Sequence, residues 1–139
     1  MITFFVQGKP APWQRVSWQG KRSFVPRETA AWKTTIAWAS KLHRPNETFK
    51  CPLFMMLIFS FERPKSRKDD FFCIGKSDVD NYCKSVMDAL HGQFYDNDNL
   101  VVALYAFKIY GTPGVEITVG EMTEFMKNPQ IVGIKNFLH

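Results

Sequence analysis

The sequence predicts an α+β fold in a single domain, a small mixed β-sheet with two main helices packed on it. Three observations lead to this prediction. Runs of β-forming residues occur near the start, in the middle and in the last third of the chain. Two other segments carry apolar residues at helical spacing. The chain has 139 residues, 45% of them hydrophobic, which is enough for one core without disulfides.

The N-terminal segment is expected to begin with a strand and continue as a basic hairpin. Residues 2–8 are rich in β-forming side chains, and Gly8 and Pro10 end the run. Residues 9–26 are basic and aromatic. Gly20 predicts a turn between two short strands there.

The middle of the chain predicts a helix, a strand and a loop. Residues 26–45 favour a helix that Pro45 stops, with apolar residues at roughly helical spacing: Ala30, Trp32, Ile36, Trp38 and Leu42. We expect both tryptophans of this helix to be core residues. Residues 53–64 predict a strand that is buried on both faces at first and then alternates. Residues 65–76 show no periodicity and predict a mobile loop.

The last third predicts a second helix and two strands. Residues 79–91 favour a helix, residues 99–110 a long strand and residues 115–122 a strand with clean alternation. The remaining segment, residues 123–139, is apolar enough at its end to pack on the body of the protein or on a partner chain. We therefore divide the chain into a domain over residues 1–122 and a C-terminal tail.

The composition limits the classes of protein to consider. No apolar run approaches the roughly 20 residues that span a bilayer, and the N-terminus does not resemble a signal peptide. The three cysteines, Cys51, Cys73 and Cys83, are odd in number and unpatterned, which favours reduced thiols in the cytoplasm. We expect a cytoplasmic protein with no membrane association.

The charge is unevenly distributed along the chain. Residues 1–77 hold 14 of the 18 Lys and Arg but only five of the 13 acidic residues. This balance predicts that the basic part binds a polyanion. A cluster of acids in such a protein can still approach phosphates if a divalent cation lies between them.

The acidic residues concentrate in one stretch, "KSDVDNYCKSVMDALHGQFYDNDNLV" at 76–101. Asp78 is placed to cap the second helix, and Asp80, Lys84 and Asp88 follow at a spacing of four residues along one face. The helix–loop–strand return is expected to bring Asp98 back beside Asp78 and Asp80. Three converging carboxylates without His or Cys suit Mg²⁺ or Mn²⁺.

Two other interpretations of this stretch remain. In the first, the acids form a solvated helix face, with Asp80 and Lys84 as a surface ion pair and residues 96–98 as a polar turn. In the second, the stretch is an EF-hand calcium loop that begins at Asp78. The second fails, because Cys83 stands where the loop needs glycine and Ala89 where it needs glutamate.

The motif "DVDNYCKSVMDALHGQFYDNDNLV" resembles the signature of the RusA family of Holliday junction resolvases. The resemblance runs through Asp-x-Asp-Asn, a lysine, Asp-Ala-Leu and an acid that enters a strand: Asp78, Asp80, Asn81, Lys84, Asp88, Ala89, Leu90 and Asp98. The opening "FFVQGKPAPWQRVSW", with Arg15, is also similar to the family's first strand and basic segment. One departure is that the family's Asp-Asp pair is Asn97-Asp98 here.

The resemblance implies a homodimeric endonuclease that cuts four-way DNA junctions symmetrically during recombination and repair. It also implies that the enzyme depends on Mg²⁺, for which Mn²⁺ can substitute. It implies that Asp78, Asp80 and Asp98 are catalytic metal ligands. Lys84 is then expected to hold the scissile phosphate or stabilise developing charge. Supporting positions around the ligands are assigned to Asn81, Asp88 and Asp96, the last as a possible substitute ligand.

Basic residues outside the motif are the expected contacts to DNA. They are Lys9, Arg15, Lys21, Arg22, Arg27, Lys65, Arg67, Lys68 and Lys76. Trp13 and Trp18 lie among them and could stack on unpaired bases, or one or both could be core residues. For the loop lysines and arginine, a merely solvated charge run is the alternative.

Two rival functions stay open from the sequence. One is a metal-dependent nuclease that acts on other branched DNA, such as a flap or a nicking site. The other is a DNA-binding protein without catalysis, whose acids are structural. The sequence leaves undetermined the cleavage preference, the number of metal ions and whether a phage or a bacterium is the host.

Overall fold

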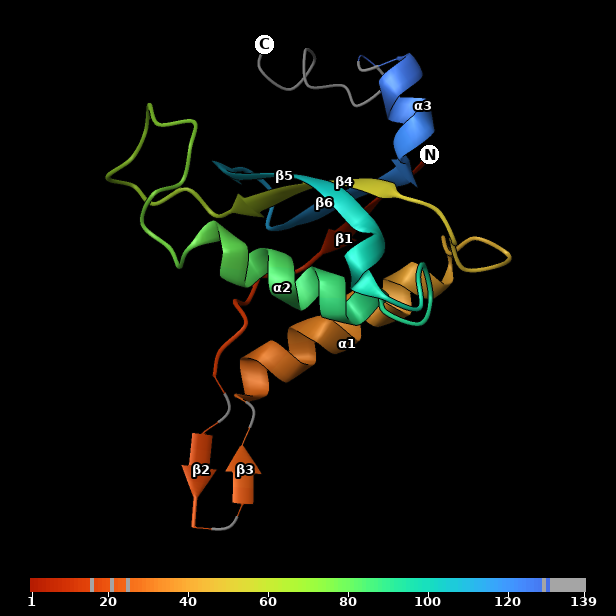
Figure 1. The fold of residues 1–139 in the computed structure, drawn as a ribbon. Helices are drawn as coiled ribbons and strands as arrows, with labels where there is room; N and C mark the ends of the chain where they lie inside the picture. Colours follow the sequence, from red (N-terminus) through yellow and green to blue (C-terminus); the bar gives the residue numbers. More distant parts are fainter. Residues whose placement is uncertain (16, 21, 25, 129, 131–139) are drawn as a thin grey trace.

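A computed structural model describes residues 1–15, 17–20, 22–24, 26–128 and 130. Its centre is a four-stranded sheet in the order β1-β6-β4-β5 (Figure 1). The strands are β1 (Ile2–Gln7), β4 (Leu53–Phe61), β5 (Val101–Tyr110) and β6 (Gly114–Glu121). β4 pairs in parallel with β5, while β6 runs antiparallel to both β1 and β4, so the sheet is mixed as predicted.

Two long helices cover one face of the sheet (Figure 1). They are α1 (Arg27–Lys41) and α2 (Val79–Leu90). Pro26 stands at the N-cap of α1, where its fixed φ suits a helix start, and Glu28 and Lys41 complement the two ends of the helix dipole. α2 connects the parallel strands β4 and β5, which is the crossover that a parallel pair requires. The predicted α+β single domain is confirmed.

The side chains form two apolar clusters, one on each face of the sheet. The larger lies between the sheet and the two helices, and its fully buried members include Ile36, Leu57, Val86 and Ile117. The smaller contains Phe54, Met56 and Ile58 of β4, packed against β5 and against Phe125 of α3 (Met122–Lys127). β4 is therefore buried along its whole length, and the alternation predicted for its second half is not found.

A short hairpin projects from the body of the protein (Figure 1). It consists of β2 (Ser17–Gln19) and β3 (Arg22–Phe24), paired antiparallel, with Gly20 in the turn at φ 62°. A positive φ is easiest for glycine, which explains why this residue stands in the turn. The turn predicted from Gly20 is confirmed. The hairpin joins the body through the segment that precedes it, residues 8–15.

Several element boundaries and one core assignment differ from the predictions. α1 ends at Lys41, four residues before Pro45, and β5 is preceded by a 3₁₀ turn, Asp98–Leu100. Trp32 is buried, but Trp38 is 66% exposed, so its assignment to the core is wrong. The predicted tail begins with α3, which packs on the sheet; its last part, residues 131–139, lies outside the described residues. Within the described chain, no helix is long and apolar enough to cross a membrane.

Candidate active site

The first two acids of the motif lie at the start of α2. Asp78 occupies the N-cap position, as predicted, but its side chain makes no capping hydrogen bond; Asp80 lies in the first turn. Both side chains are exposed, and neither has an ion-pair partner among the residues that the structure describes. Two carboxylates at a helix N-terminus thus remain available to a cation, while the helix dipole there favours negative groups.

The backbone just before Asp78 is held by β5. The Lys108 ammonium donates a hydrogen bond to the Ser77 carbonyl at 2.8 Å. The preceding loop is attached to the same strand, because the Cys73 amide donates to the Lys108 carbonyl at 2.9 Å and the Tyr110 amide donates to the Phe71 carbonyl at 3.0 Å. The edge of the sheet therefore fixes where the acidic helix begins.

The basic segment after β1 lies against the same helix. The Trp13 amide donates to the Asn81 carbonyl at 2.9 Å, and the buried Thr29 hydroxyl donates to the Pro12 carbonyl at 2.9 Å. The Lys84 ammonium lies 5.4 Å from the centre of the half-buried Trp13 ring. These contacts bring the predicted DNA-binding segment beside the acidic motif.

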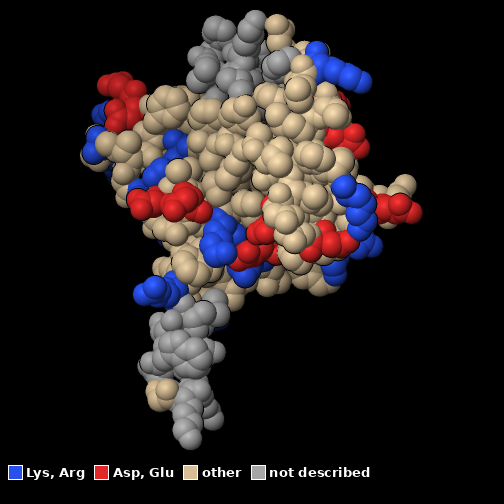
Figure 2. Space-filling view, in the orientation of Figure 1, with Lys and Arg blue, Asp and Glu red and all other residues tan. Residues whose placement is uncertain are grey.

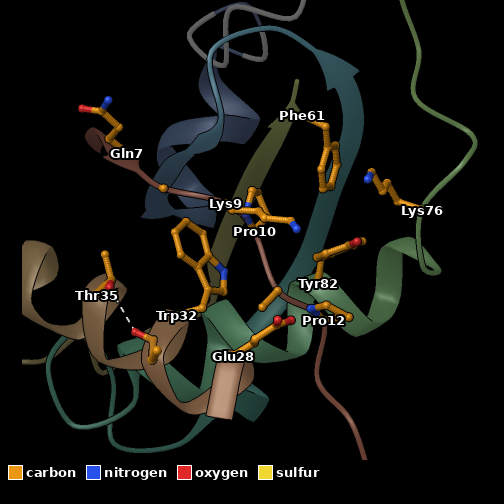
Figure 3. A pocket seen from close by; sticks show the side chains of 13 residues that line it. Gln7, Lys9, Pro10, Pro12, Glu28, Trp32, Thr35, Phe61, Lys76 and Tyr82 are labelled. Carbon is orange, nitrogen blue, oxygen red and sulfur yellow. Dashed lines mark hydrogen bonds between the residues drawn. The ribbon is translucent and has the colours of Figure 1, made fainter. Parts of the chain in front are cut away.

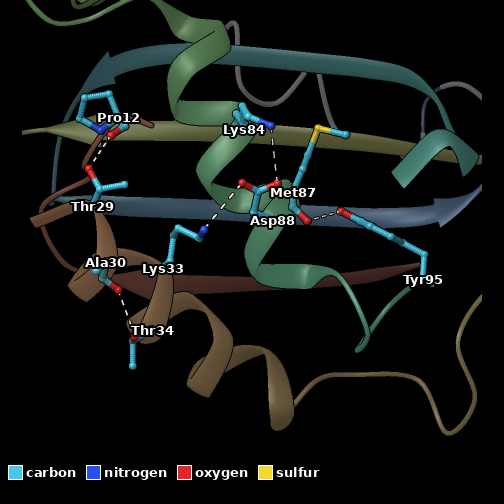
Figure 4. A network of polar contacts seen from close by, with 9 residues as sticks. All are labelled: Pro12, Thr29, Ala30, Lys33, Thr34, Lys84, Met87, Asp88 and Tyr95. Atoms are coloured by element: carbon cyan, nitrogen blue, oxygen red, sulfur yellow. Dashed lines mark hydrogen bonds and ion pairs between the residues drawn. The ribbon is translucent and has the colours of Figure 1, made fainter. Parts of the chain in front are cut away.

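Asp88 and Lys84 form a bridge between the two helices (Figure 4). The Asp88 carboxylate lies 3.7 Å from the Lys33 ammonium on α1 and 3.9 Å from the Lys84 ammonium one turn earlier on α2. The partner of Lys84 is thus Asp88, whereas the surface-ion-pair interpretation paired Lys84 with Asp80. Asp88 accordingly has a structural place between α1 and α2.

Asp98 lies at the opposite end of α2 from Asp78 and Asp80. Its neighbour Tyr95 is buried and donates a hydrogen bond to the Met87 carbonyl at 2.8 Å (Figure 4). Burial raises the pKa of Tyr95, and the negative charges of Asp98 and Asp88 raise it further.

The length of α2 separates its two ends, because a helix of 12 residues is about 18 Å long. Within the described part of the chain, no group of three or more acidic, His or Cys side chains is arranged to hold a metal, so one chain does not bring the three predicted ligands together.

The reason lies in the connection between α2 and β5. The Phe94 amide donates to the Leu90 carbonyl and the Gly92 amide to the Tyr95 carbonyl, so the loop folds back on the C-terminal end of the helix. β5 then starts at that end and runs toward the other. The chain therefore returns at the C-terminal part of α2 and not beside Asp78, as had been predicted.

Asp96 and Asn97 have structural partners of their own. The Asp96 carboxylate accepts hydrogen bonds from Lys50 and from the Thr48 hydroxyl, and these contacts lower the pKa of Asp96. The Asn97 side chain accepts from the Asn99 amide at 3.0 Å and so caps the 3₁₀ turn. Asp98 has no ion-pair partner among the described residues, which favours it over Asp96 as the acid carried over from the family motif.

The donor set can be compared with what Mg²⁺ requires. Mg²⁺ binds proteins through one or two carboxylates and fills its other positions with water and substrate phosphate. Asp78 and Asp80 satisfy that requirement. Asp98 would be a third ligand of the same ion only if a second copy of the chain supplied it.

Most of the basic residues predicted to contact DNA are exposed. Lys9, Arg15, Arg27, Lys65, Arg67, Lys68 and Lys76 are all exposed. The Arg67 guanidinium forms an ion pair with the Asp70 carboxylate at 3.1 Å, so its charge is partly neutralised within the protein. Arg22 begins β3, and Lys21 lies outside the described residues. Figure 2 shows that positive and negative side chains interleave over the helices, whereas the surface above them on that face is largely uncharged.

The cysteine of the motif lies in the core of the protein. Cys83 is buried in the main cluster, and burial together with the charge of Asp80 raises the pKa of its thiol to about 11. A neutral thiol is a poor nucleophile and a poor metal ligand. The interpretation of Cys83 as a packing residue agrees with this.

Sequence reasoning missed three residues that organise the site. Lys108 holds the Ser77 carbonyl, Thr29 holds Pro12, and Arg63 donates to the carbonyls of residues 67, 68 and 70 and so shapes the loop after β4. A lysine inside a strand and a buried threonine at a helix start were the available signals. Neither signal identifies the carbonyl that the side chain contacts.

Two comparisons place the chain among known proteins. Residues 7–120 match the family model described as endodeoxyribonuclease RusA. The chain is also 30% identical over 138 residues to the uncharacterized protein YqaN of Bacillus subtilis (strain 168), which covers 88% of this chain and 97% of the relative. The matched residues include β4, β5, both long helices, the acidic motif and all of β6 except Glu121, whereas only Gln7 of β1 falls within the match. This chain therefore belongs to the RusA family of endodeoxyribonucleases.

Proposed function

We propose that this protein is a Mg²⁺-dependent endonuclease that resolves four-way DNA junctions by paired, symmetric cleavage, acting as a homodimer. The observation that carries the proposal is that the carboxylates of Asp78 and Asp80, at the start of α2, are exposed and have no ion-pair partner among the described residues. Both lie within the stretch that the family model matches. The exposed basic residues beside them supply affinity for phosphates.

The residues of this chain can hold and orient the reacting phosphate. Asp78 and Asp80 would bind the cation, which supplies an activated water and neutralises charge on the phosphate when bound. The Lys84 ammonium lies one turn beyond Asp80 on an exposed part of α2, where it can reach an approaching phosphate. Its contact with Asp88 and with the Trp13 ring restricts its position before DNA arrives.

A homodimer would account for the cutting of two strands and for the separation of Asp98 from Asp78 and Asp80 within one chain. A four-way junction has two equivalent strands to cut, and an isologous dimer presents two identical sites across a two-fold axis. In such a dimer, Asp98 of one copy could face Asp78 and Asp80 of the other, which would complete the ligand set that one chain separates. β5 is an edge strand of the sheet and exposes Val102 and Leu104, which are suitable contact material.

The proposal is tested by comparing substrates in one assay. Purified protein with Mg²⁺ is incubated with a four-way junction, a flap and a linear duplex of matched sequence. We expect symmetric paired cuts in the junction and little cleavage of the other two. Preferential flap cleavage would favour the rival branched-DNA nuclease. Binding without cleavage of any substrate, in Mg²⁺ or Mn²⁺, would favour the non-catalytic protein.

A further inference from the structure

A pocket of about 420 Å³ lies next to the start of α2, between the end of β1 and the first turns of α1. Its floor is buried and apolar, and consists of Pro10, Ala11, Trp32, Phe61 and Tyr82. Its rim is exposed and polar, with Gln7, Lys9, Glu28, Thr35 and Lys76 (Figure 3). An apolar floor with a few polar groups at its edge, in this range of volume, is typical of sites that bind small molecules.

The floor carries an unsatisfied donor. Trp32 is 4% exposed, and its indole Nε1 has no hydrogen-bond partner among the residues that the structure describes. Figure 3 shows this nitrogen turned toward the side of the pocket where Pro12, Glu28 and Tyr82 lie. A buried N–H without an acceptor is costly, and because the group lies below the surface, an acceptor must enter the pocket to reach it.

The backbone at Gly8 packs against the Trp32 ring in the floor of the pocket. Gly8 has φ 145°, and a Cβ on it would come within 2.8 Å of the Trp32 ring. The indole therefore packs directly on the backbone that leads to Lys9. Phe61 and Tyr82 meet edge to face with their ring centres 5.2 Å apart. The aromatic residues of the floor are thus held in position by packing and do not depend on a ligand.

The rim is placed to hold a phosphate between the pocket and the acids. Lys9 and Lys76 both line the pocket, and Figure 3 shows the Lys76 nitrogen turned toward Phe61 and Tyr82. Both lysines also line an adjoining hollow of about 460 Å³, together with Arg63 and Lys65. Lys76 precedes Asp78 by two residues, and Tyr82 follows it by one helical turn. A chain of phosphates crossing the two lysines therefore passes the candidate metal ligands.

From this arrangement we propose that the pocket receives one unpaired nucleobase of the DNA, with its phosphates on Lys9 and Lys76. Aromatic side chains stack on any base, and a base carries ring-nitrogen and carbonyl acceptors for a buried N–H. A branch point provides bases that are easier to unstack than those of a regular duplex. The base anchors the strand so that a neighbouring phosphate lies at Asp78 and Asp80. This inference rests on the proposed function, since it assumes a branched DNA substrate.

Ala31 and Ala30 provide a matched pair of variants to test the pocket. Both are exposed on the first half of α1, but Ala31 lines the pocket and Ala30 does not. Ala31→Phe should fill the pocket and weaken binding to a four-way junction, measured without metal, by about 10-fold, the scale of losing one base–aromatic stack. Ala30→Phe should change it by less than about 2-fold. Thermal unfolding of both variants should match the wild type.

A set of junctions, each lacking one base near the branch point, supplies the second measurement. One abasic position should weaken wild-type binding by about the same factor as Ala31→Phe and should have no further effect on that variant. Equal losses in the two alanine variants, or no loss in either, would overturn the pocket assignment while leaving junction binding itself in place. A wild-type protein that binds junctions no better than linear duplex would instead overturn the proposed function and this inference with it.

Discussion

Individual aspartates of the motif differ in what their carboxylates contact. Asp88 bridges two lysines between α1 and α2, and Asp96 is held by Lys50 and Thr48. For Asp78, Asp80 and Asp98, no ion pair is found within the described ranges of the chain. Carboxylates that already have protein partners serve the fold, whereas exposed carboxylates without partners are free to bind a cation.

The first prediction separates these two groups by cleavage. Asp80→Asn should abolish Mg²⁺-dependent cleavage of a four-way junction while leaving junction binding unchanged, because it removes a metal ligand and no basic group. Asp98→Asn should behave in the same way. Asp96→Asn is the matched control and should retain cleavage, because its carboxylate is engaged by Lys50. Gel-shift titration and single-turnover cleavage of the three variants provide the comparison.

A specific pattern of results would show that the motif has been misaligned. If Asp96→Asn were inactive and Asp98→Asn active, the essential acid at this turn would be Asp96. Substantial cleavage by Asp80→Asn would show instead that the ligand set itself is wrong.

The second prediction is a pH dependence of stability at Asp96. Hydrogen bonds from Lys50 and Thr48 lower the pKa of this carboxyl in the folded protein. A lowered folded-state pKa stabilises the protein above the unfolded value of about 3.9, and the stabilisation is lost as the pH falls through the folded pKa. The melting temperature of the wild type should therefore exceed that of Asp96→Asn near neutral pH. The gap should close on acidification below about pH 4; a gap that stays constant would assign the difference to another cause.

At the scale of elements, periodicity predicted the helices and strands but not how they join. The apolar spacing placed α2 and the strands on either side of it within a few residues. The loop closes on the C-terminal end of α2 through Tyr95 and Met87, and no local pattern in residues 91–100 indicates that contact. The family motif predicts which acids act as ligands, but only tertiary contacts decide which end of the helix each acid occupies.

The exposure of Trp38 follows from its angular position on α1. Trp32, Ile36 and Ser40 are buried at intervals of four residues along one face of α1. Trp38 is two positions after Ile36, a rotation of about 200°, and therefore faces away from that stripe. Its ring lies under the Lys41 ammonium at 4.3 Å. A stricter count of helical angles would have predicted its exposure, whereas the partners of Thr29 and Lys108 could not be predicted in this way.

The third prediction concerns Lys84 as part of the contact between α1 and α2. Lys84→Ala removes a half-exposed ion pair with Asp88, which Lys33 still contacts, so stability should fall by no more than about 0.5 kcal/mol. Turnover should nevertheless be lost, because the ammonium is expected at the phosphate. Urea unfolding and single-turnover cleavage would be measured together. Wild-type cleavage by this variant would leave Lys84 with a surface ion-pair role alone.

At the scale of the whole molecule, the two ends of α2 carry different parts of the predicted ligand set. Asp78 and Asp80 lie at one end beside Lys76 and the basic segment, and Asp98 lies at the other beside β5. A two-fold axis that relates two copies of α2 in opposite directions would bring the end of one helix to the start of the other. This arrangement would yield two equivalent sites, one for each strand to be cut.

The last prediction tests whether each site draws on two copies, by mixing two inactive variants. Asp80→Asn and Asp98→Asn would be unfolded, combined in equal amounts and refolded together. If each site takes Asp78 and Asp80 from one copy and Asp98 from the other, a mixed dimer has one site with both substitutions and one site with none. The intact site should then nick junctions. Because half of randomly assembled dimers are mixed, the number of active sites should approach about a quarter of the wild-type number.

Refolded samples of each single variant are the controls and should stay inactive. If every site were built within one chain, the mixture would remain as inactive as its components, since both copies of the mixed dimer would lack a ligand. A monomer mass in sedimentation equilibrium, free and on a junction, would exclude the shared site and the paired cuts, and would leave a nuclease with a single site.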